Sequence, residues 1–524
     1  MIIISKCNCE KNYTPEIISE LSHIKNGETL FFEKGTYHFF EEGAFEGFFA
    51  PTNNETGIKR VAFPLIGLSD ITIDGNGSTF VFHGRVSPFI IQHSKNITIK
   101  NITLTTYRAP YALLQITEKS EEKFSCRFDS EKMPCKVSDG NLAFLTDSGE
   151  LNTKNKILSF HALSRVVIRY MFSVDCKKSR ENLPAPYMNC RICENNDTVD
   201  FYYADDGKAE KCVYDVGELI SINLEENRLR DGFFLEDSQN VVISDINIRR
   251  GGGMGVIAQL CENVEISNLR VKPEANEPVT LTADILHFVN CSGKLSIHDC
   301  EFESSLDDAC NIHGNYTVIS DIADKHIDVE YKHEAHSFLE MYKPGDVLTV
   351  IDNTTLDELC TFEVSECSFT DDSGMKIRLV SNSNLPEGLK CGYLVENPLR
   401  MPDVHIYNNK STNIPHWRIS GAGNILVENN YYDDCGCPVY AYDLAQYWYE
   451  SGRIKNLTIK NNTFKNARYG DGFVITGVSG YDSENAPLIH ENITITDNVF
   501  DGFKNKALTV AGFRNKVIKN NIMK

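Results

Sequence analysis

The sequence predicts an all-β protein, a right-handed parallel β-helix (a solenoid), from a short strand formula that recurs along the chain. Each occurrence has a polar turn with Asn, an alternating Ile/Val/Leu strand and a closing Asn or Asp, as in residues 95–100, 240–245, 263–268 and 492–498. Val241 and Val264 occupy the same point of the formula 23 residues apart, about one coil of such a solenoid.

The alternation of the strands explains why the coils must stack. β-branched residues alternate with polar residues at a period of two, so one face of each strand is buried and the other is solvated. One coil cannot bury its apolar face alone. The Asn at each corner tolerates the left-handed backbone of a sharp turn and predicts side-chain ladders between coils. A hairpin-built β-sandwich is the alternative, but Asn-Gly and Asp-Gly hairpin signals are sparse between these runs.

Residues 1–116 are expected to form an N-terminal cap and the first coils. Residues 15–23 have a short helical pattern, and residues 27–37 resemble the first strand of such solenoids. A helix over the open end hides the edge of the sheet.

Two stretches interrupt the rhythm of the coils and are predicted to be inserted small β subdomains. Residues 117–227 are rich in cysteine and charge, and residues 316–400 carry alternating strands typical of a small antiparallel barrel. Residues 228–315 are then the central coils that carry the carboxylates described below, and residues 401–524 are the C-terminal coils.

The charge of the chain makes some classes of partner unfavourable. The 524 residues carry a formal net charge of −21, which disfavours nucleic acid, anionic lipid and, more weakly, polyanionic substrates such as pectate. We expect no membrane span, because no window approaches ~18 apolar residues. The N-terminus lacks the basic region and long apolar run of a signal peptide, so the cytoplasm is favoured over secretion. The oligomeric state is open, and a homo-oligomer is possible.

The 17 cysteines are interpreted mostly as reduced, buried thiols, since they form no compact framework. One group, Cys176, Cys190, Cys193 and Cys212, contains a C-x2-C spacing that suits tetrahedral zinc. The other two ligands are irregularly spaced, so a structural zinc is the less favoured interpretation.

Three carboxylates stand close together in the central coils. Asp284 lies in residues 282–288, 23 residues before Asp307, which is followed by Asp308 in residues 305–314. Residues one coil apart lie roughly 4.8 Å apart on neighbouring rungs, so the three carboxylates are expected to meet. Crowded carboxylates split their pKa values and supply an acid and a base, as glycoside hydrolysis requires. The alternative for the Asp-Asp pair is a solvated turn or a calcium site.

These segments resemble glycoside hydrolase family 110. The resemblance rests on Thr-Ala-Asp-Ile-Leu-His-Phe at 282–288, Cys-Ser-Gly at 291–293 and Asp-Asp-Ala-Cys-Asn-Ile-His-Gly at 307–314. Gly-Met-Gly-Val-Ile-Ala-Gln at 253–259 and Trp-Tyr-Glu-Ser-Gly at 448–452 extend it. The family contains β-helix exo-α-galactosidases that remove terminal α-1,3-linked galactose with inversion, including from blood-group-B-type glycans.

The resemblance implies roles for individual residues, with no metal and no cofactor. The resemblance implies that Asp307 is the general acid and that Asp284 or Asp308 is the base that activates water. Gln259 is expected one coil before Asp284, and Trp448 is expected to stack on the apolar face of the sugar. The residues expected to bind the substrate, an oligosaccharide or glycoconjugate with terminal galactose, are Gln259, His287, Asn311, His313, Arg418, Trp448 and Glu450.

Other functions on the same fold remain open, because β-helices host several chemistries. A pectate lyase would need a groove lined by Lys and Arg, and the sequence has no basic cluster near Asp307. A polygalacturonase shares the Asp-Asp pair but usually has Gly-His-Gly and Arg-x-Lys motifs, and the nearest piece here is Ile-His-Gly at 312–314. An exo-glycosidase for another terminal sugar and a non-catalytic glycan-binding solenoid are the further alternatives.

Overall fold

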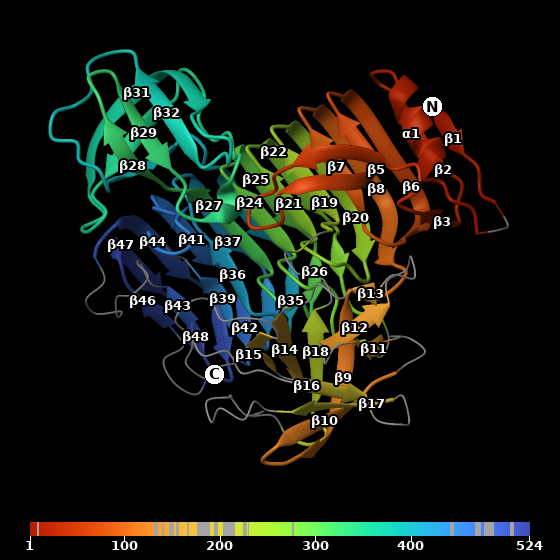
Figure 1. Cartoon of the computed structure of the whole chain (residues 1–524). Helices are drawn as coiled ribbons and strands as arrows, with labels where there is room; N and C mark the ends of the chain where they lie inside the picture. The colour runs from red at the N-terminus through yellow and green to blue at the C-terminus, as the bar shows by residue number, and fades with distance from the viewer. Residues whose placement is uncertain are drawn as a thin grey trace.

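The chain forms a parallel β-helix with two subdomains projecting from it (Figure 1). The computed structural model describes residues 1–524 except 8–9, 130–134, 139–140, 146–150, 153–156, 165–166, 176–188, 193–196, 203–214, 224–227, 229, 275–276, 441–444, 467–472, 476–486 and 504–507. The cysteines considered for zinc at positions 176, 193 and 212, and the side chain at position 190, lie outside these described parts.

Two faces of the β-helix belong to one 20-stranded parallel sheet that bends at a corner. The first face contains β1 (Ile2–Ile4), β2 (Thr29–Phe32), β6 (Ser69–Phe82), β8 (Lys95–Thr106), β20 (Gln239–Ile248), β22 (Glu262–Ser267), β25 (Ser292–His298), β34 (Asp403–Tyr407), β37 (Asn424–Glu428), β41 (Asn456–Lys460), β44 (His490–Thr496) and β47 (Phe513–Lys519). The second contains the later halves of β6, β8 and β20 with β3 (Thr36–Phe39), β23 (Arg270–Val271), β26 (Glu301–Glu303), β35 (Lys410–Thr412), β38 (Tyr431–Asp433), β42 (Thr463–Lys465), β45 (Val499–Asp501) and β48 (Ile522–Met523).

The third face is a separate sheet that carries the candidate site. Its strands are β4 (Phe45–Phe49), β5 (Gly57–Ile66), β7 (Val86–Gln92), β19 (Phe233–Glu236), β21 (Val256–Gln259), β24 (Leu286–Val289), β27 (Cys310–Asn315), β36 (His416–Ile419) and β39 (Cys437–Tyr440). A short strand, β40 (Glu450–Ser451), pairs antiparallel with the end of β27. This parallel three-faced arrangement confirms the predicted β-helix.

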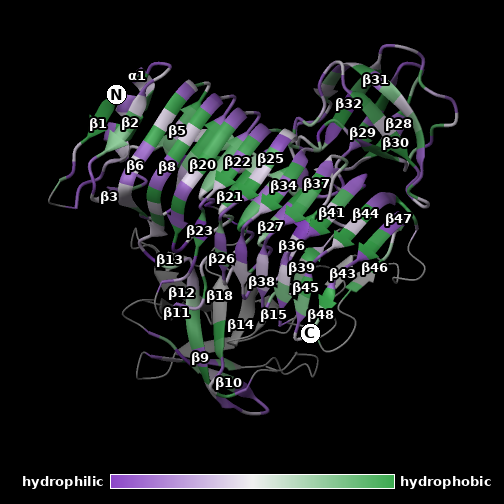
Figure 2. Cartoon of the chain, turned by 180° about the vertical axis from the view of Figure 1, so that it is seen from behind, coloured by the Kyte–Doolittle hydropathy of each residue, from purple (hydrophilic) through white to green (hydrophobic). Residues whose placement is uncertain are grey.

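The corners and the core follow the predicted pattern. Asn96, Asn240 and Asn263 have φ of 55° to 58°, and each donates or accepts in a side-chain ladder with spacings of 2.8 and 3.0 Å. Inside the coils, Tyr432, Phe464 and Phe500 stack with ring centroids 5.0 Å apart. Figure 2 shows the resulting alternation of apolar and polar positions along the strands.

The N-terminal end of the β-helix is covered by a helix, α1 (Thr14–His23). Ile17 and Leu21 of α1 are buried in the core of the first coils. The predicted cap is therefore confirmed. Among the described residues, no helix combines the length and apolarity needed to cross a bilayer.

Residues 317–396 form a closed barrel of antiparallel strand pairs, which projects from the β-helix at the upper left of Figure 1. Its strands are β28 (Thr317–Ile322), β29 (His326–Glu330), β30 (Val347–Ile351), β31 (Glu358–Phe369), β32 (Lys376–Ser381) and β33 (Leu394–Glu396), with a 3-10 turn, η1 (Glu334–His336), between β29 and β30. This barrel directly follows β27, so it lies next to the candidate site.

A seven-stranded antiparallel sheet projects from the lower side of the β-helix in Figure 1. It contains β9 (Tyr111–Lys119), β10 (Lys123–Arg127), β14 (Ile157–Ser164), β15 (Val167–Asp175), β16 (Asn189–Ile192), β17 (Thr198–Tyr202) and β18 (Leu219–Asn223). Two smaller sheets consist of β11 (Cys135–Ser138), β12 (Asn141–Leu145) and β13 (Leu151–Asn152), and of β43 (Phe473–Ile475) and β46 (Leu508–Val510).

Candidate active site

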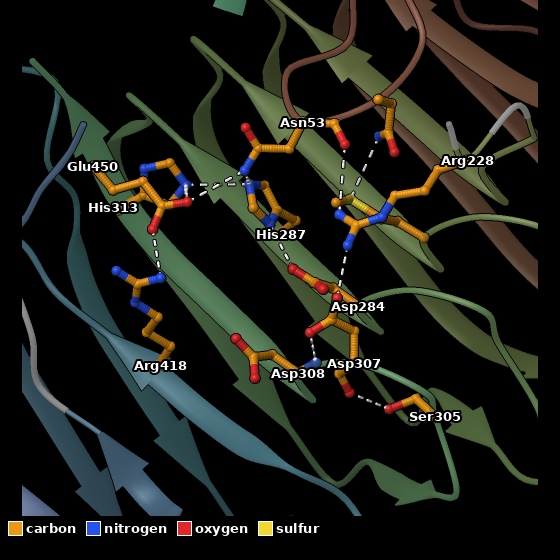
Figure 3. Close-up of polar contacts among 12 residues, drawn as sticks. Asn53, Arg228, Asp284, His287, Ser305, Asp307, Asp308, His313, Arg418 and Glu450 are labelled. Atoms are coloured by element: carbon orange, nitrogen blue, oxygen red, sulfur yellow. Dashed lines mark hydrogen bonds and ion pairs between the residues drawn. The ribbon is translucent and has the colours of Figure 1, made fainter. Parts of the chain in front are cut away.

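The three predicted carboxylates lie where β24 and β27 begin on the third face (Figure 3). The two strands pair with His287 beside Asn311. If the same register is extended to the residues that precede the two strands, Asp284 lies beside Asp308. The step from β24 to β27 is therefore 24 residues rather than 23, and Asp284 interacts with both Asp307 and Asp308, as expected.

Asp307 and Asp308 both face the site because they precede the regular strand. Neighbouring residues alternate faces within a strand, but β27 begins only at Cys310. The backbone bends here, with the Ser305 hydroxyl donating to the Asp307 carbonyl at 2.6 Å and the Asp308 N–H donating to Asp307 Oδ1 at 3.1 Å. Because of this bend, both carboxylates can serve one site.

Burial changes the acidity of all three carboxyl groups. Asp284 is 4 % exposed and Asp308 is 9 % exposed, whereas the Asp307 side chain is 25 % exposed. Burial raises the pKa of Asp284 to about 6, with Arg228 opposing the rise. Burial and then the charge of Asp284 raise the pKa of Asp307. Burial and both neighbouring carboxylates raise the pKa of Asp308 well above its usual range. The cluster therefore retains protons at pH values where an ordinary Asp is ionised.

Two predicted imidazoles connect Asp284 to the end of β27. His287 Nδ1 lies 2.7 Å from Asp284 Oδ2, and His287 Nε2 lies 3.1 Å from His313 Nε2. His313 Nδ1 in turn lies 2.8 Å from the carbonyl oxygen of Gly314. Burial lowers the pKa of both imidazoles to about 4. Both rings are therefore neutral near pH 7.

The protonation state of Asp284 sets the tautomer of His287 in this row. The three contacts need three protons, because Gly314 offers only a carbonyl oxygen. Two neutral imidazoles supply two protons. Below its pKa of about 6 Asp284 supplies the third proton, and above that pH the row holds only two. Ionisation of Asp284 therefore requires the proton of His287 to move to Nδ1, where it can donate to the carboxylate.

Glu450 and Arg418 form a buried ion pair beside the imidazoles. Glu450 is positioned by β40, and its Oε2 lies 2.6 Å from Arg418 Nη1, while its Oε1 lies 3.5 Å from His313 Nε2. Burial alone would raise the pKa of Glu450, but Arg418 and then His313 outweigh burial and lower it to about 2. Glu450 is therefore a permanent carboxylate acceptor in the site.

Asn311 presents an acceptor in the centre of this face. It lies between His287 on β24 and Arg418 on β36 in the parallel register. Its side chain is 4 % exposed, and its Oδ1 atom has no hydrogen-bond partner among the described residues. A buried acceptor without a partner costs free energy unless a ligand supplies a donor.

Arg228, which was not predicted from the sequence, forms an ion pair with Asp307. Its Nη2 atom lies 2.6 Å from Asp307 Oδ2. Arg228 precedes the third-face strand β19 by five residues, and it belongs to no recurring formula. No signal in the sequence would have identified it.

A loop before β5 closes the site from the other side. The Asn53 amide nitrogen lies 3.2 Å from Glu450 Oε1 and 3.3 Å from His287 Nε2, and Asn53 Oδ1 lies 3.0 Å from His336 Nε2 of η1. The sequence around Asn53 has no periodic pattern, so this loop was also missed. The barrel thus supplies His336, which fixes a loop that contacts two predicted site residues.

Gln259 holds this loop and lies away from the carboxylates. It is fully buried, accepts from the Thr52 N–H at 2.9 Å, and donates to the Ala50 carbonyl at 3.1 Å and to Glu236 at 2.6 Å. Its neighbour in the register is Val289, which lies five residues beyond Asp284. Gln259 therefore lies one coil before the coil of Asp284, as expected. Its amide group is fully hydrogen-bonded to protein partners, and it positions the loop.

A fourth carboxylate, Asp231, lies in the same column as the predicted cluster. It precedes β19 by two residues, just as Asp284 precedes β24 and Asp308 precedes β27. This repeated offset is a signal that could have identified it. Asp231 accepts from the Met254 N–H at 2.9 Å, and burial raises its pKa to about 6.

Trp448 lies at the rim, one layer outside the imidazoles. Its ring is tilted against that of His333, with the ring centroids 4.1 Å apart, and contacts the Tyr447 ring edge-on, with the centroids 5.1 Å apart. His333 is in turn 5.7 Å from His336. Trp448 is half-buried, so it is not a core residue, and part of its ring is available to a ligand.

Comparison with known proteins agrees with the resemblance seen in the sequence. No family model matches the chain. Alpha-1,3-galactosidase A of Shewanella woodyi is 29% identical over 96% of this chain and 83% of its own length. Alpha-1,3-galactosidase B of Bacteroides thetaiotaomicron is 26% identical over 91% of this chain and 77% of its own length.

Among solved structures, a polygalacturonase of Erwinia carotovora is 9% identical with a TM-score of 0.42, covering 100% of this chain and 96% of its own. The relatives named α-1,3-galactosidase match almost the whole chain at 24% to 29% identity. The resemblance to glycoside hydrolase family 110 is thereby confirmed, and the chain is a glycoside hydrolase related to the α-1,3-galactosidases.

Proposed function

We propose that this protein removes terminal α-1,3-linked galactose from oligosaccharides or glycoconjugates by an exo-acting, inverting mechanism. The observation that carries the proposal is the cluster of Asp284, Asp307 and Asp308 at the start of adjacent strands, with raised pKa values. The names of the relatives supply the sugar and the linkage. Blood-group-B-type glycans are candidate substrates.

Asp307 acts as the general acid in this proposal. Its side chain is the most exposed of the three carboxylates, so it can reach the glycosidic oxygen of a bound substrate. Its pKa is raised despite the contact with Arg228. A proton held above the usual range of an Asp is what an acid catalyst needs.

Asp284 or Asp308 acts as the base that activates water, and the acidities favour Asp284. A base must be ionised at the working pH. Asp284 has a pKa of about 6, whereas that of Asp308 lies well above its usual range. In this assignment His287 donates its Nδ1 proton to the ionised carboxylate and orients it.

The sugar-binding residues are those that offer fixed polar groups beside the carboxylates. Glu450 accepts from hydroxyls, Asn311 offers its unpartnered Oδ1, and Arg418 donates. The Asn53 loop and His336 lie against one side of the site, which fits an enzyme that accepts only the end of a chain. Trp448 stacks on the aglycone at the rim.

The test is a proton-NMR time course with galactose-α-1,3-galactose. Release of β-galactose before mutarotation is expected, because direct attack of water inverts the anomeric centre. Release of α-galactose first would overturn the inverting mechanism. No cleavage would overturn the linkage, and other terminal sugars and galacturonan would be tested next. The Asp307→Asn variant is the matched control and should release almost no galactose.

A further inference from the structure

We propose that Glu10, His38 and His83 form a structural binding site for a divalent transition metal, with zinc as the favoured ion. These residues lie at the N-terminal end of the β-helix, near β3 and the end of β6 in Figure 1. Among the described residues they are the one group of three potential ligands with atoms close enough to share an ion. The site is separate from the three catalytic carboxylates and does not depend on the proposed function.

The ligand atoms lie close enough together for one zinc ion to reach all three. His38 Nδ1 lies 2.9 Å from His83 Nε2, and Glu10 Oε1 lies 3.8 Å from the first and 4.0 Å from the second. A point equidistant from three atoms at these separations lies about 2.1 Å from each, within the usual Zn–N and Zn–O distances. Two imidazoles and one carboxylate leave a position for water and suit zinc better than calcium or magnesium.

Without the ion the two imidazoles already contact each other through the hydrogen bond between His38 Nδ1 and His83 Nε2, which an ion would replace. His83 is 6 % exposed, and its ring is stacked between Phe40 at 4.0 Å and Tyr107 at 4.5 Å. His38 belongs to β3, whose register with β6 places it beside Val81. A preorganised pair loses little freedom on binding an ion.

Glu10 is delivered by a separate segment that is tied to the same strand. Asn12, two residues later, forms a parallel bridge with His38, and the Tyr13 N–H donates to the His38 carbonyl at 2.9 Å. The Glu10 side chain itself is 60% exposed, so it can move to close the third bond. An ion would therefore clamp the segment before α1 onto the first coils.

The experiment uses the tag-free full chain, treated with EDTA and titrated with Co²⁺ and then Zn²⁺. The 17 cysteines can also bind these ions, so the spectrum of bound Co²⁺ separates the two kinds of site. Nitrogen and oxygen ligands give d–d bands without the thiolate charge-transfer band of a cysteine site. We expect one equivalent of this thiolate-free kind, displaced by Zn²⁺, and a rise in Tm of about 2 °C at a hundredfold excess over Kd.

Two variants test the assignment. Glu10→Gln alters an exposed side chain, so folding is preserved, and His38→Gln removes a half-buried ligand. Each should weaken the thiolate-free site by at least about tenfold and abolish the rise in Tm. The matched control is His298→Gln, because His298 also lies near two carboxylates, Glu265 at 3.5 Å and Asp299 at 2.7 Å. Unchanged affinity in Glu10→Gln and His38→Gln, or a spectrum with thiolate bands only, would overturn the proposal.

Discussion

His287 Nδ1 lies 2.7 Å from Asp284 Oδ2, and both side chains are almost completely buried. This contact couples the acidity of the favoured base to a neutral imidazole. While Asp284 is protonated it donates to His287, and once ionised it accepts from His287, whose tautomer must change. The imidazole therefore supports both protonation states of the carboxylate.

The first prediction concerns His287→Gln. The amide nitrogen of Gln can donate to Asp284 but does not exchange a proton with it, so the ionised carboxylate is favoured and its pKa falls. Activity needs the ionised base, so it rises with pH through that pKa, which is about 6 in the wild type. We expect the acidic limb of the kcat/KM profile to move to lower pH and the plateau to fall about 10²-fold.

A matched control for this variant is His405→Gln. His405 also contacts a carboxylate, Glu428, at 2.9 Å, but on a different face of the β-helix. It should leave the pH profile unchanged. A His287→Gln enzyme with the wild-type acidic limb would show that Asp284 is not the titrating base.

The second prediction separates acid from base among the carboxylates. Asp307→Asn and Asp284→Asn should each lower kcat on galactose-α-1,3-galactose by about 10³-fold or more, since they remove the assigned acid and the favoured base. In an aryl α-galactoside with an acidic phenol as the leaving group, the phenolate departs without being protonated by the enzyme. Asp307→Asn should therefore lose much less activity on that substrate, while a variant of the base stays inactive on both. Equal losses of both variants on both substrates would contradict the assignment of the acid.

The β-helix could be predicted from the sequence because its signals are local and repeated. Asn240 and Asn263 mark the same corner of adjacent coils, and the register of β20 and β22 keeps the 23-residue spacing of Val241 and Val264. Each coil is a short element with a period-two pattern, so pattern and structure coincide. The exact register of the site coil was harder to predict, because the step from β24 to β27 is 24 residues, one more than the 23 from β20 to β22.

The site residues that repeat with the coils could be predicted from the sequence, whereas those on loops outside the coil repeat could not. Asp284 and Asp308 stand on adjacent rungs, so spacing along the chain reveals them. Asn53 lies 234 residues from its partner His287 in the sequence, and Arg228 lies 79 residues from its partner Asp307. Contacts of that kind are fixed by the packing of loops and of the barrel, and no periodic signal encodes them.

The third prediction concerns the loop that Gln259 anchors. Replacing Gln259 by Met removes three hydrogen bonds and leaves the Thr52 N–H and Ala50 carbonyl without this partner. Losing buried hydrogen bonds costs about 1–3 kcal/mol for each group left unsatisfied. The Asn53 loop should then loosen, so KM should rise about tenfold while kcat changes less. If Gln259 instead bound the sugar in the transition state, kcat would fall with KM unchanged.

The last prediction concerns Asp231 and the pH dependence of stability. Its pKa is raised from the usual 3.8 to about 6 by burial, so between these values the folded protein holds a proton that the unfolded chain has lost. The free energy of unfolding therefore falls as pH rises from 4 through 6, by up to about 3 kcal/mol for this group. Asp231→Asn removes the ionisation while its amide oxygen still accepts from the Met254 N–H.

We expect the Tm of Asp231→Asn to exceed that of the wild type at pH 7.5 and to lose this advantage at pH 4.5. Asp328→Asn is the control of opposite sign, because its contact with Arg378 lowers its pKa, so its ionised form contributes stability that is lost only as pH falls. Asp328→Asn should therefore lower Tm at pH 7.5 rather than raise it. If Asp231→Asn were equally destabilising at both pH values, Asp231 would be an ordinary ionised carboxylate held by its hydrogen bonds.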